Sequence, residues 1–130
     1  MPQKILLIED DPDVIDTLLV KLQGAGYEIV VASAGMEGLD KVYQESPDLI
    51  ILDLMLPQLD GLQICRILKF DERYKHIPIM MLTGKTDDRD VKLGLKVGAD
   101  KYLTKPFEPV QVLTEVNRLL ERPAQPTERG

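Results

Sequence analysis

The stretch KILLIEDDP, from Lys4 to Pro12, joins a short apolar run directly to a helix start. Lys4–Ile8 has the length and composition of a strand that is buried on both faces. Asp11 and Pro12 then stand in the order that helix starts favour, with an acid at the N-cap and proline at the first helical position. The apolar residues that follow recur at helical spacing: Val14, Ile15, Leu18, Leu19 and Leu22. The chain therefore opens with a strand followed by an amphipathic helix.

The same alternation continues along the chain. Further strands are predicted at Glu28–Ala32, Leu49–Leu52, Ile77–Leu82 and Asp100–Leu103. Further helices are predicted around Met36–Tyr43, from Asp60-Gly61 onward, over residues 87–98, and from Pro109 to Leu120. Apolar strands separated by helices are typical of a parallel sheet with right-handed connections. We therefore expect an α/β fold, a doubly wound five-stranded parallel sheet with five helices.

The helix over residues 87–98 is the exception to the clear pattern. Its apolar residues alternate with polar residues or glycine, which is typical of a strand: Val91, Leu93, Leu95 and Val97. A strand here would leave too little chain for a crossover before the last strand, so a helix is the better interpretation. Gly94 costs about 1 kcal/mol in a helix interior relative to alanine. This helix is therefore predicted to be the least stable of the five.

Composition excludes several classes of protein. A chain of 130 residues suits one domain, and its net charge of -6 disfavours direct binding to nucleic acid. A single cysteine indicates a reducing compartment, and neither a signal peptide nor a membrane span of about 18 apolar residues is visible. We expect a cytoplasmic domain over residues 1–122. Residues 123–130 are expected to be a flexible tail or the start of a linker.

Reactive side chains follow four of the five predicted strands. The first strand is followed by Glu9-Asp10-Asp11, the third by Asp53, the fourth by Thr83-Gly84 and the fifth by Thr104-Lys105-Pro106. Ligands of open α/β sheets bind at the carboxyl ends of the strands. The sequence thus predicts one pocket that combines carboxylates, a hydroxyl and an ammonium.

This mixture of groups suits phosphoryl transfer. Clustered carboxylates repel one another, and a hard cation such as Mg²⁺ relieves the repulsion. One carboxylate can attack phosphorus to give an aspartyl phosphate. Lys105, the Thr83 hydroxyl and Mg²⁺ could each neutralise one phosphoryl oxygen.

Four motifs carry a resemblance to a known family. Glu9-Asp10, Asp53 in LIILDLMLPQLDG, Thr83-Gly84, and Lys105-Pro106 in KYLTKPF resemble the receiver domain of bacterial two-component response regulators. The resemblance runs from about Lys4 to Arg122. It implies the flavodoxin-like, CheY-like fold with strand order 2-1-3-4-5.

The resemblance also implies a role for each matching residue. Asp53 would be the phosphoacceptor. Mg²⁺ would be bound by Asp10, Asp53 and the backbone carbonyl of Met55, with Glu9 acting through a water molecule. Asp11 is interpreted instead as the cap of the first helix.

Three further residues complete the implied site. Lys105 would contact the phosphoryl group, and the Lys105–Pro106 bond would be cis. Thr83 and Tyr102 would form a switch pair. The alternatives are that Thr83 caps the fourth helix and that Tyr102 is only an aromatic residue of the sheet edge.

The function implied is that of a signal receiver in a phosphorelay. A sensor histidine kinase or phosphotransfer protein would donate the phosphoryl group. The surface formed by the fourth helix, fifth strand and fifth helix would then act on an output partner or a fused output domain. Apart from slow self-phosphorylation and self-dephosphorylation, no enzyme activity is expected.

Dimerisation through that surface is left open. In the winged-helix subclass, ion pairs across this surface stabilise a symmetric dimer. Val91 and Gln111 are uncharged where an ion pair is usual, and Lys101 and Glu115 carry the opposite order of charges. Asp100 and Arg122 fit the pattern. The sequence therefore leaves three alternatives open: a phosphorylation-dependent dimer, a stand-alone receiver, and a receiver attached to another type of output domain.

The main alternative is a small, Mg²⁺-dependent phosphatase with an aspartate nucleophile, similar to the haloacid dehalogenases. Asp11-Pro12-Asp13 superficially resembles their DxD motif. Pro12, however, is predicted to begin a helix, and 130 residues leave no room for a substrate cap. The receiver interpretation is therefore preferred.

Overall fold

The computed structural model describes residues 2–54, 56, 59–84 and 98–121. Within these ranges five strands and four helices follow one another along the chain. They are β1 (Lys4–Ile8), α1 (Pro12–Gly24), β2 (Glu28–Ala32), α2 (Gly35–Glu45), β3 (Leu49–Asp53), α3 (Gly61–Lys69), β4 (Ile79–Thr83), β5 (Lys101–Thr104) and α5 (Pro109–Glu121).

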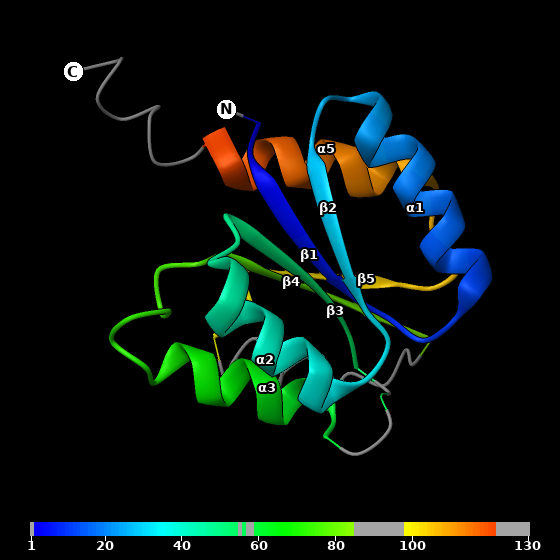
Figure 1. Ribbon diagram of the computed structural model, residues 1–130. Coiled ribbons are helices and arrows are strands. Elements are labelled where there is room, and N and C mark those ends of the chain that lie inside the picture. The colour runs from blue at the N-terminus through cyan, green and yellow to red at the C-terminus, as the bar shows by residue number, and fades with distance from the viewer. Residues whose placement is uncertain (1, 55, 57–58, 85–97, 122–130) are drawn as a thin grey trace.

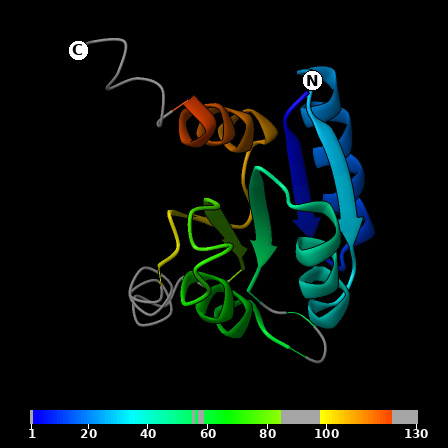
Figure 2. The same cartoon turned by 60° about the vertical axis from the view of Figure 1, so that its left-hand side comes forward.

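All strand pairs of the sheet are parallel, and the order is β2-β1-β3-β4-β5. Figure 1 shows α1 and α5 on one face of the sheet and α2 and α3 on the other. In the turned view, the arrowheads of the strands point in the same direction, so the strands end on the same side of the sheet (Figure 2). The predicted fold class and strand order are therefore confirmed. The helix predicted over residues 87–98 lies outside the described residues, except for Gly98.

Two apolar cores lie on the two faces of the sheet. Leu6 and Ile8 belong to the core on the α2 and α3 face, whereas Ile5 and Leu7 belong to the core on the α1 and α5 face. Successive side chains of a strand point to opposite faces, so a strand covered on both faces must be apolar throughout. This is why the continuous run in β1 predicted a buried strand.

Strand boundaries shift by one or two residues from those expected. β4 begins at Ile79 rather than Ile77, directly after Pro78, which has no N–H to give to a ladder. β5 begins at Lys101 rather than Asp100. The Asp100 carboxylate accepts hydrogen bonds from the Ile79 N–H (2.8 Å) and from Lys69 Nζ (3.0 Å), and so ties the entry of β5 to α3 and β4.

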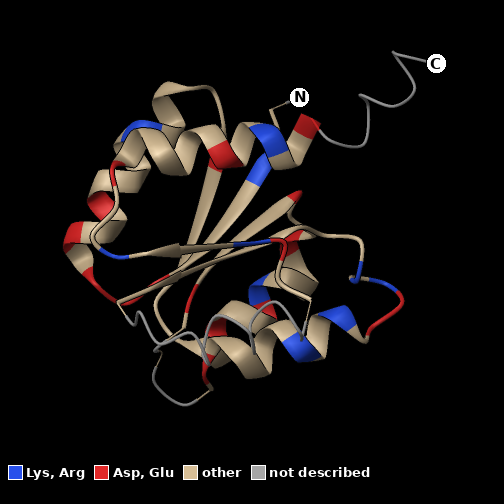
Figure 3. Ribbon diagram, turned by 180° about the vertical axis from the view of Figure 1, so that it is seen from behind, with Lys and Arg blue, Asp and Glu red and all other residues tan. Residues whose placement is uncertain are grey.

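Two aspartates begin helices as their positions in the sequence predict. Asp11 caps α1 and accepts a hydrogen bond from the Asp13 N–H at 3.0 Å. Asp60 caps α3 in a reciprocal arrangement with Gln63, the capping box. Acidic residues dominate the start of α1 (Figure 3).

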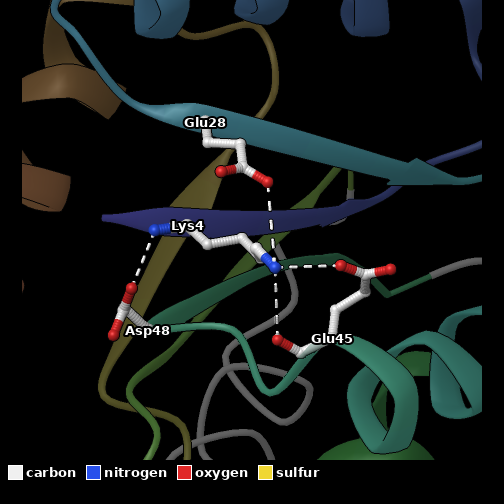
Figure 4. Close-up of polar contacts among 4 residues, drawn as sticks. All are labelled: Lys4, Glu28, Glu45 and Asp48. Atoms are coloured by element: carbon white, nitrogen blue, oxygen red, sulfur yellow. Dashed lines mark hydrogen bonds and ion pairs between the residues drawn. The ribbon is translucent and has the colours of Figure 1, made fainter. Parts of the chain in front are cut away.

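A cluster of charged groups joins the amino-terminal ends of the three strands β2, β1 and β3. Lys4 Nζ lies 2.9 Å from the Glu45 carboxylate and 3.7 Å from that of Glu28 (Figure 4). The backbone N–H of Lys4 donates to Asp48 at 2.7 Å. These contacts lie at the amino-terminal ends of the strands, on the opposite side of the sheet from the arrowheads.

Candidate functional site

Side chains with reactive groups gather where the strands end. Glu9 and Asp10 follow β1, Asp53 is the last residue of β3, Thr83 is the last residue of β4, and Lys105 follows β5. The parallel register pairs Asp53 with Leu82 and Thr83 with Thr104, so these residues lie together at the carboxyl-terminal ends of the strands. The predicted convergence is present in the structure.

Lys105 bridges two of the carboxylates. Its Nζ lies 2.9 Å from Glu9 Oε1 and 3.5 Å from Asp53 Oδ2. Glu9 is fully buried and Asp53 is 4% exposed. Charges that are removed from water in this way require partners of opposite sign, and Lys105 is one such partner.

Three carboxylates lie close enough together to share a cation. Ligand oxygens of Glu9, Asp10 and Asp53 all lie within 4.8 Å of one another. Asp10 is exposed, so this side of the cluster is open to solvent. An all-oxygen set of carboxylates suits a hard divalent cation such as Mg²⁺.

Backbone amides fix the orientation of Glu9. Its Oε2 atom accepts hydrogen bonds from the N–H groups of Asp10 and Asp11, both at 3.1 Å. Its Oε1 atom faces Lys105. Both oxygens of this buried carboxylate are therefore directed by neighbours.

The pKa values of the ion pair move in the same direction for different reasons. Burial raises the pKa of Glu9, and the neighbouring Asp53 adds to this, although Lys105 and the Asp11 N–H oppose it. Burial alone lowers the pKa of Lys105, but its contacts with Glu9 and Asp53 outweigh that effect and raise the pKa. Lys105 therefore remains a cation at neutral pH.

The predicted switch residues lie on neighbouring strands. Thr83 is fully buried, and Tyr102 is half-buried against the core on the α2 and α3 face. The register pairs Met81 with Tyr102 and Thr83 with Thr104. Thr83 and Tyr102 therefore lie on the same face of the sheet, two residues apart along the strand direction. The backbone N–H of Lys105 donates to the Thr83 carbonyl at 2.5 Å, which links the ends of β4 and β5.

The structure describes the remaining predicted site residues except Met55. Asp11 serves as the cap of α1. The Lys105–Pro106 peptide bond is cis, as the resemblance implied. Met55, the predicted carbonyl ligand, lies outside the described residues.

The sequence did not reveal a groove beside Lys105. A cavity of about 460 Å³ is lined by side chains from the start of α1 and from the segment between β5 and α5, among them Asp11, Val14, Thr17, Lys105, Phe107 and Pro109. These two segments are about 90 residues apart in the chain. Only their packing side by side creates the groove, so no local pattern could predict it.

Comparison with known proteins identifies the family. A family model described as the response regulator receiver domain matches residues 5–117. The chain belongs to this family. Receiver domains of response regulators are signalling domains rather than classical enzymes, so the phosphatase alternative is not supported.

Curated relatives agree with this assignment. The chain is 43% identical over 122 residues to the alkaline phosphatase synthesis transcriptional regulatory protein PhoP of Bacillus subtilis, covering 94% of the chain and 50% of that protein. It is also 43% identical to the DNA-binding response regulator MtrA of Mycobacterium tuberculosis H37Rv, covering 94% of the chain and 52% of that protein. The chain thus spans about half the length of these relatives.

Solved structures of receivers have the same architecture. A putative response regulator from Chloroflexus aurantiacus superimposes with a TM-score of 0.87 at 38% identity, covering 92% of this chain and 98% of that one. The chemotaxis response regulator CheY4 of Vibrio cholerae gives a TM-score of 0.85 at 33% identity, covering 92% and 99%. Among the described residues of the receiver, no helix combines the length and the apolar composition needed to cross a membrane.

Proposed function

We propose that this receiver takes a phosphoryl group onto Asp53 from a histidine kinase or a phosphotransfer protein in the cytoplasm. The supporting observation is the contact of Lys105 with both Glu9 and Asp53, beside the three-carboxylate cluster. An Asp53 carboxylate oxygen forms the new bond to phosphorus. The phosphorus–nitrogen bond of the donor phosphohistidine breaks, and the imidazole leaves with its electron pair.

Each neighbour of Asp53 has a part in this proposal. Lys105 binds a phosphoryl oxygen and offsets its charge, and the Thr83 hydroxyl binds another. Asp10 and Asp53 would hold Mg²⁺ together with the Met55 carbonyl, and Glu9 would act through a water molecule. When bound, Mg²⁺ supplies positive charge against the carboxylates and the phosphoryl oxygens.

The groove beside Lys105 supports approach of the donor from this side. It exposes apolar surface of Val14 and Phe107 beside Lys105, whose ammonium would contact the phosphoryl group on Asp53. A donor helix that packs on this surface would hold its phosphohistidine near Asp53.

Output is proposed to pass through Thr83 and Tyr102. Phosphorylation draws the Thr83 hydroxyl toward the phosphoryl group, the Tyr102 ring turns inward, and the surface of β5, α5 and the helix predicted over 87–98 changes. The relatives named above are DNA-binding or transcriptional regulators about twice as long. We therefore propose a receiver over residues 1–122, a tail or linker start over 123–130, and a separate output partner or domain.

A dimer that forms on phosphorylation is the second way in which this surface could act. Three of the charged residues assigned to it, Lys101, Glu115 and Asp100, already have partners within the chain. Lys101 Nζ lies 3.7 Å from the Glu115 carboxylate, and Asp100 binds Lys69. A symmetric dimer would therefore exchange these internal pairs for pairs across the interface.

Intact mass after incubation with Mg²⁺ and a small phosphoryl donor tests the central proposal. We expect one added phosphoryl group in the native protein, none in Asp53→Asn and very little after addition of a chelator. Asp40→Asn, which changes an exposed acid on α2, is the matched control and should behave as the native protein does. Normal modification of Asp53→Asn would overturn the assignment.

A further inference from the structure

Gly61, the first residue of α3, lies directly against the backbone of Asp53. A Cβ atom at position 61 would lie 2.6 Å from the Asp53 carbonyl oxygen and 2.9 Å from the Leu54 Cα. Both are backbone atoms, which cannot swing aside as the end of a flexible side chain can. The start of α3 therefore approaches Asp53 as closely as it does only because residue 61 has no side chain.

Hydrogen bonds fix the Asp53 segment on two sides. The N–H of Leu54 donates to the Leu82 carbonyl of β4 at 2.9 Å. The N–H of Gly61 donates to the Leu54 carbonyl at 3.0 Å. The peptide that carries Asp53 is thus held between β4 and the start of α3.

The start of α3 is itself well anchored. The Gln63 N–H donates to Asp60 Oδ1 at 2.9 Å, and the Asp60 N–H donates to Gln63 Oε1 at 3.2 Å. One turn further on, Ile64 is fully buried in the core on this face. A side chain at position 61 would therefore displace Asp53 and Leu54 rather than the helix alone.

A displacement of Asp53 acts on the whole cluster. Its Oδ2 atom lies 3.5 Å from Lys105, and its carboxylate shares the 4.8 Å cluster with Glu9 and Asp10. Errors of about 1 Å in the position of a reacting group can lower a rate by about 100-fold. The distance between Gly61 and Asp53 therefore bears on the chemistry as well as on packing.

We propose that Gly61 is a positioning residue for phosphoryl transfer, because its missing side chain lets α3 hold the Asp53 backbone in register with Glu9, Asp10 and Lys105. This role rests on the proposed function of Asp53. The φ angle of Gly61 lies outside the left-handed range, so alanine is compatible with its backbone conformation. The effect of alanine then comes from the close approach and not from backbone strain.

Two measurements on Gly61→Ala test the role. The first is the initial rate of phosphorylation, followed by intact mass as a function of Mg²⁺ concentration. The second is the affinity for Mn²⁺ alone, followed by the electron paramagnetic resonance signal of free Mn²⁺. We expect the rate to fall on the order of 10-fold or more, and both the Mg²⁺ requirement and the Mn²⁺ dissociation constant to rise several-fold.

Two control variants separate positioning from general effects. Gly24→Ala makes the same chemical change at the end of α1, where a Cβ would meet nothing within 4 Å. Ile64→Ala leaves a cavity in the core beside the same helix and lowers stability without adding atoms against the Asp53 backbone. Both are expected to keep the native rate and Mn²⁺ affinity within about twofold.

The outcomes are distinguishable. If Gly61→Ala matches Gly24→Ala, or loses no more activity than Ile64→Ala, the positioning role is wrong while the function of Asp53 stands. If the native protein is not phosphorylated on Asp53, the proposed function itself fails. Should Gly61→Ala not fold, Asp60→Ala decides: it loosens the start of α3 without adding atoms, and native Mn²⁺ affinity in this variant would overturn the role.

Discussion

The Lys105 ammonium lies 2.9 Å from Glu9 Oε1, so a cation that follows the edge strand neutralises a fully buried carboxylate at the end of a central strand. Asp53, at the end of the neighbouring strand β3, lies 3.5 Å from the same ammonium. Lys105 thus joins two requirements in one group. It compensates buried negative charge, and it stands where a phosphoryl group on Asp53 would need a positive partner.

Replacing Lys105 tests both requirements. Lys105→Ala is expected to lower the phosphorylation rate by about 100-fold, because a preorganised electrostatic contact to the phosphoryl group is lost. Stability should fall as well, since Glu9 is left buried without its cation. Glu9→Gln in the Lys105→Ala background should restore much of the stability but not the rate. Lys21→Ala, on α1, is the control, and a Lys105→Ala rate within twofold of the native rate would contradict the assignment.

Divalent cations are expected to stabilise the folded protein. A cation that binds the folded state alone adds RT ln(1 + [L]/Kd) to the free energy of unfolding. The midpoint of thermal unfolding should therefore rise with Mg²⁺ and return on chelation. Asp10→Asn should remove this rise, whereas Asp16→Asn, an exposed acid on α1, should retain it. An equal rise in both variants would mean that the cation binds elsewhere.

The Lys4 cluster predicts a loss of stability in acid. The hydrogen bond and the positive charge of Lys4 hold the pKa of the Glu45 carboxyl below its usual range. A depressed folded-state pKa contributes stability that is present above the unfolded value, about 4.3, and is lost as the pH falls through the folded value. Glu45→Gln should therefore be less stable than the native protein at pH 7, and this difference in stability should shrink as the pH falls below about 4.3.

Urea unfolding at several pH values measures this difference. Glu108→Gln, an exposed acid outside the cluster, is the control and should show no such convergence. A Glu45→Gln deficit that persists unchanged in acid would assign the loss to something other than the ion pair.

The buried thiol of Cys65 predicts that the free energy of unfolding falls as the pH rises. Burial raises the pKa of this thiol from 9.0 to about 11. A raised folded-state pKa contributes stability that is complete below the unfolded value and is lost as the pH rises toward the folded one. The two-unit shift corresponds to at most about 2.7 kcal/mol.

A comparison with Cys65→Ala isolates this contribution. The free energy of unfolding of the native protein should fall relative to that of Cys65→Ala between about pH 9 and pH 11. The alanine variant keeps every other ionisable group of the chain, so their effects cancel in this comparison. Parallel curves for the two proteins would show that the thiol is not the cause.

Much of the fold followed from local pattern. The continuous apolar runs of β1 and β3 predicted strands covered on both faces, and Asp11-Pro12 predicted the start of α1 correctly. Because parallel strands end at a common edge, the site could be assembled from residues far apart in the sequence. β5 gave a weaker signal, since all four of its residues are only half-buried.

Other features depend on contacts that no local pattern encodes. Asp100 matches the charge pattern of the dimer-forming subclass, and in the structure its carboxylate binds Lys69, 31 residues away, and the Ile79 N–H. Gly61 was recognised as a helix start, but its approach to Asp53 arises only when α3 packs back on the sheet. The groove beside Lys105 has the same origin.

The ion pairs of Lys4 and of Lys69 with Asp100 lie where the strands begin, whereas Glu9, Asp53, Thr83 and Lys105 lie where they end. These two sets of ion pairs therefore lie at the opposite end of the strands from the proposed phosphoryl-transfer site. Substitutions at these strand-start ion pairs are therefore expected to change the stability of the domain without altering the geometry around Asp53.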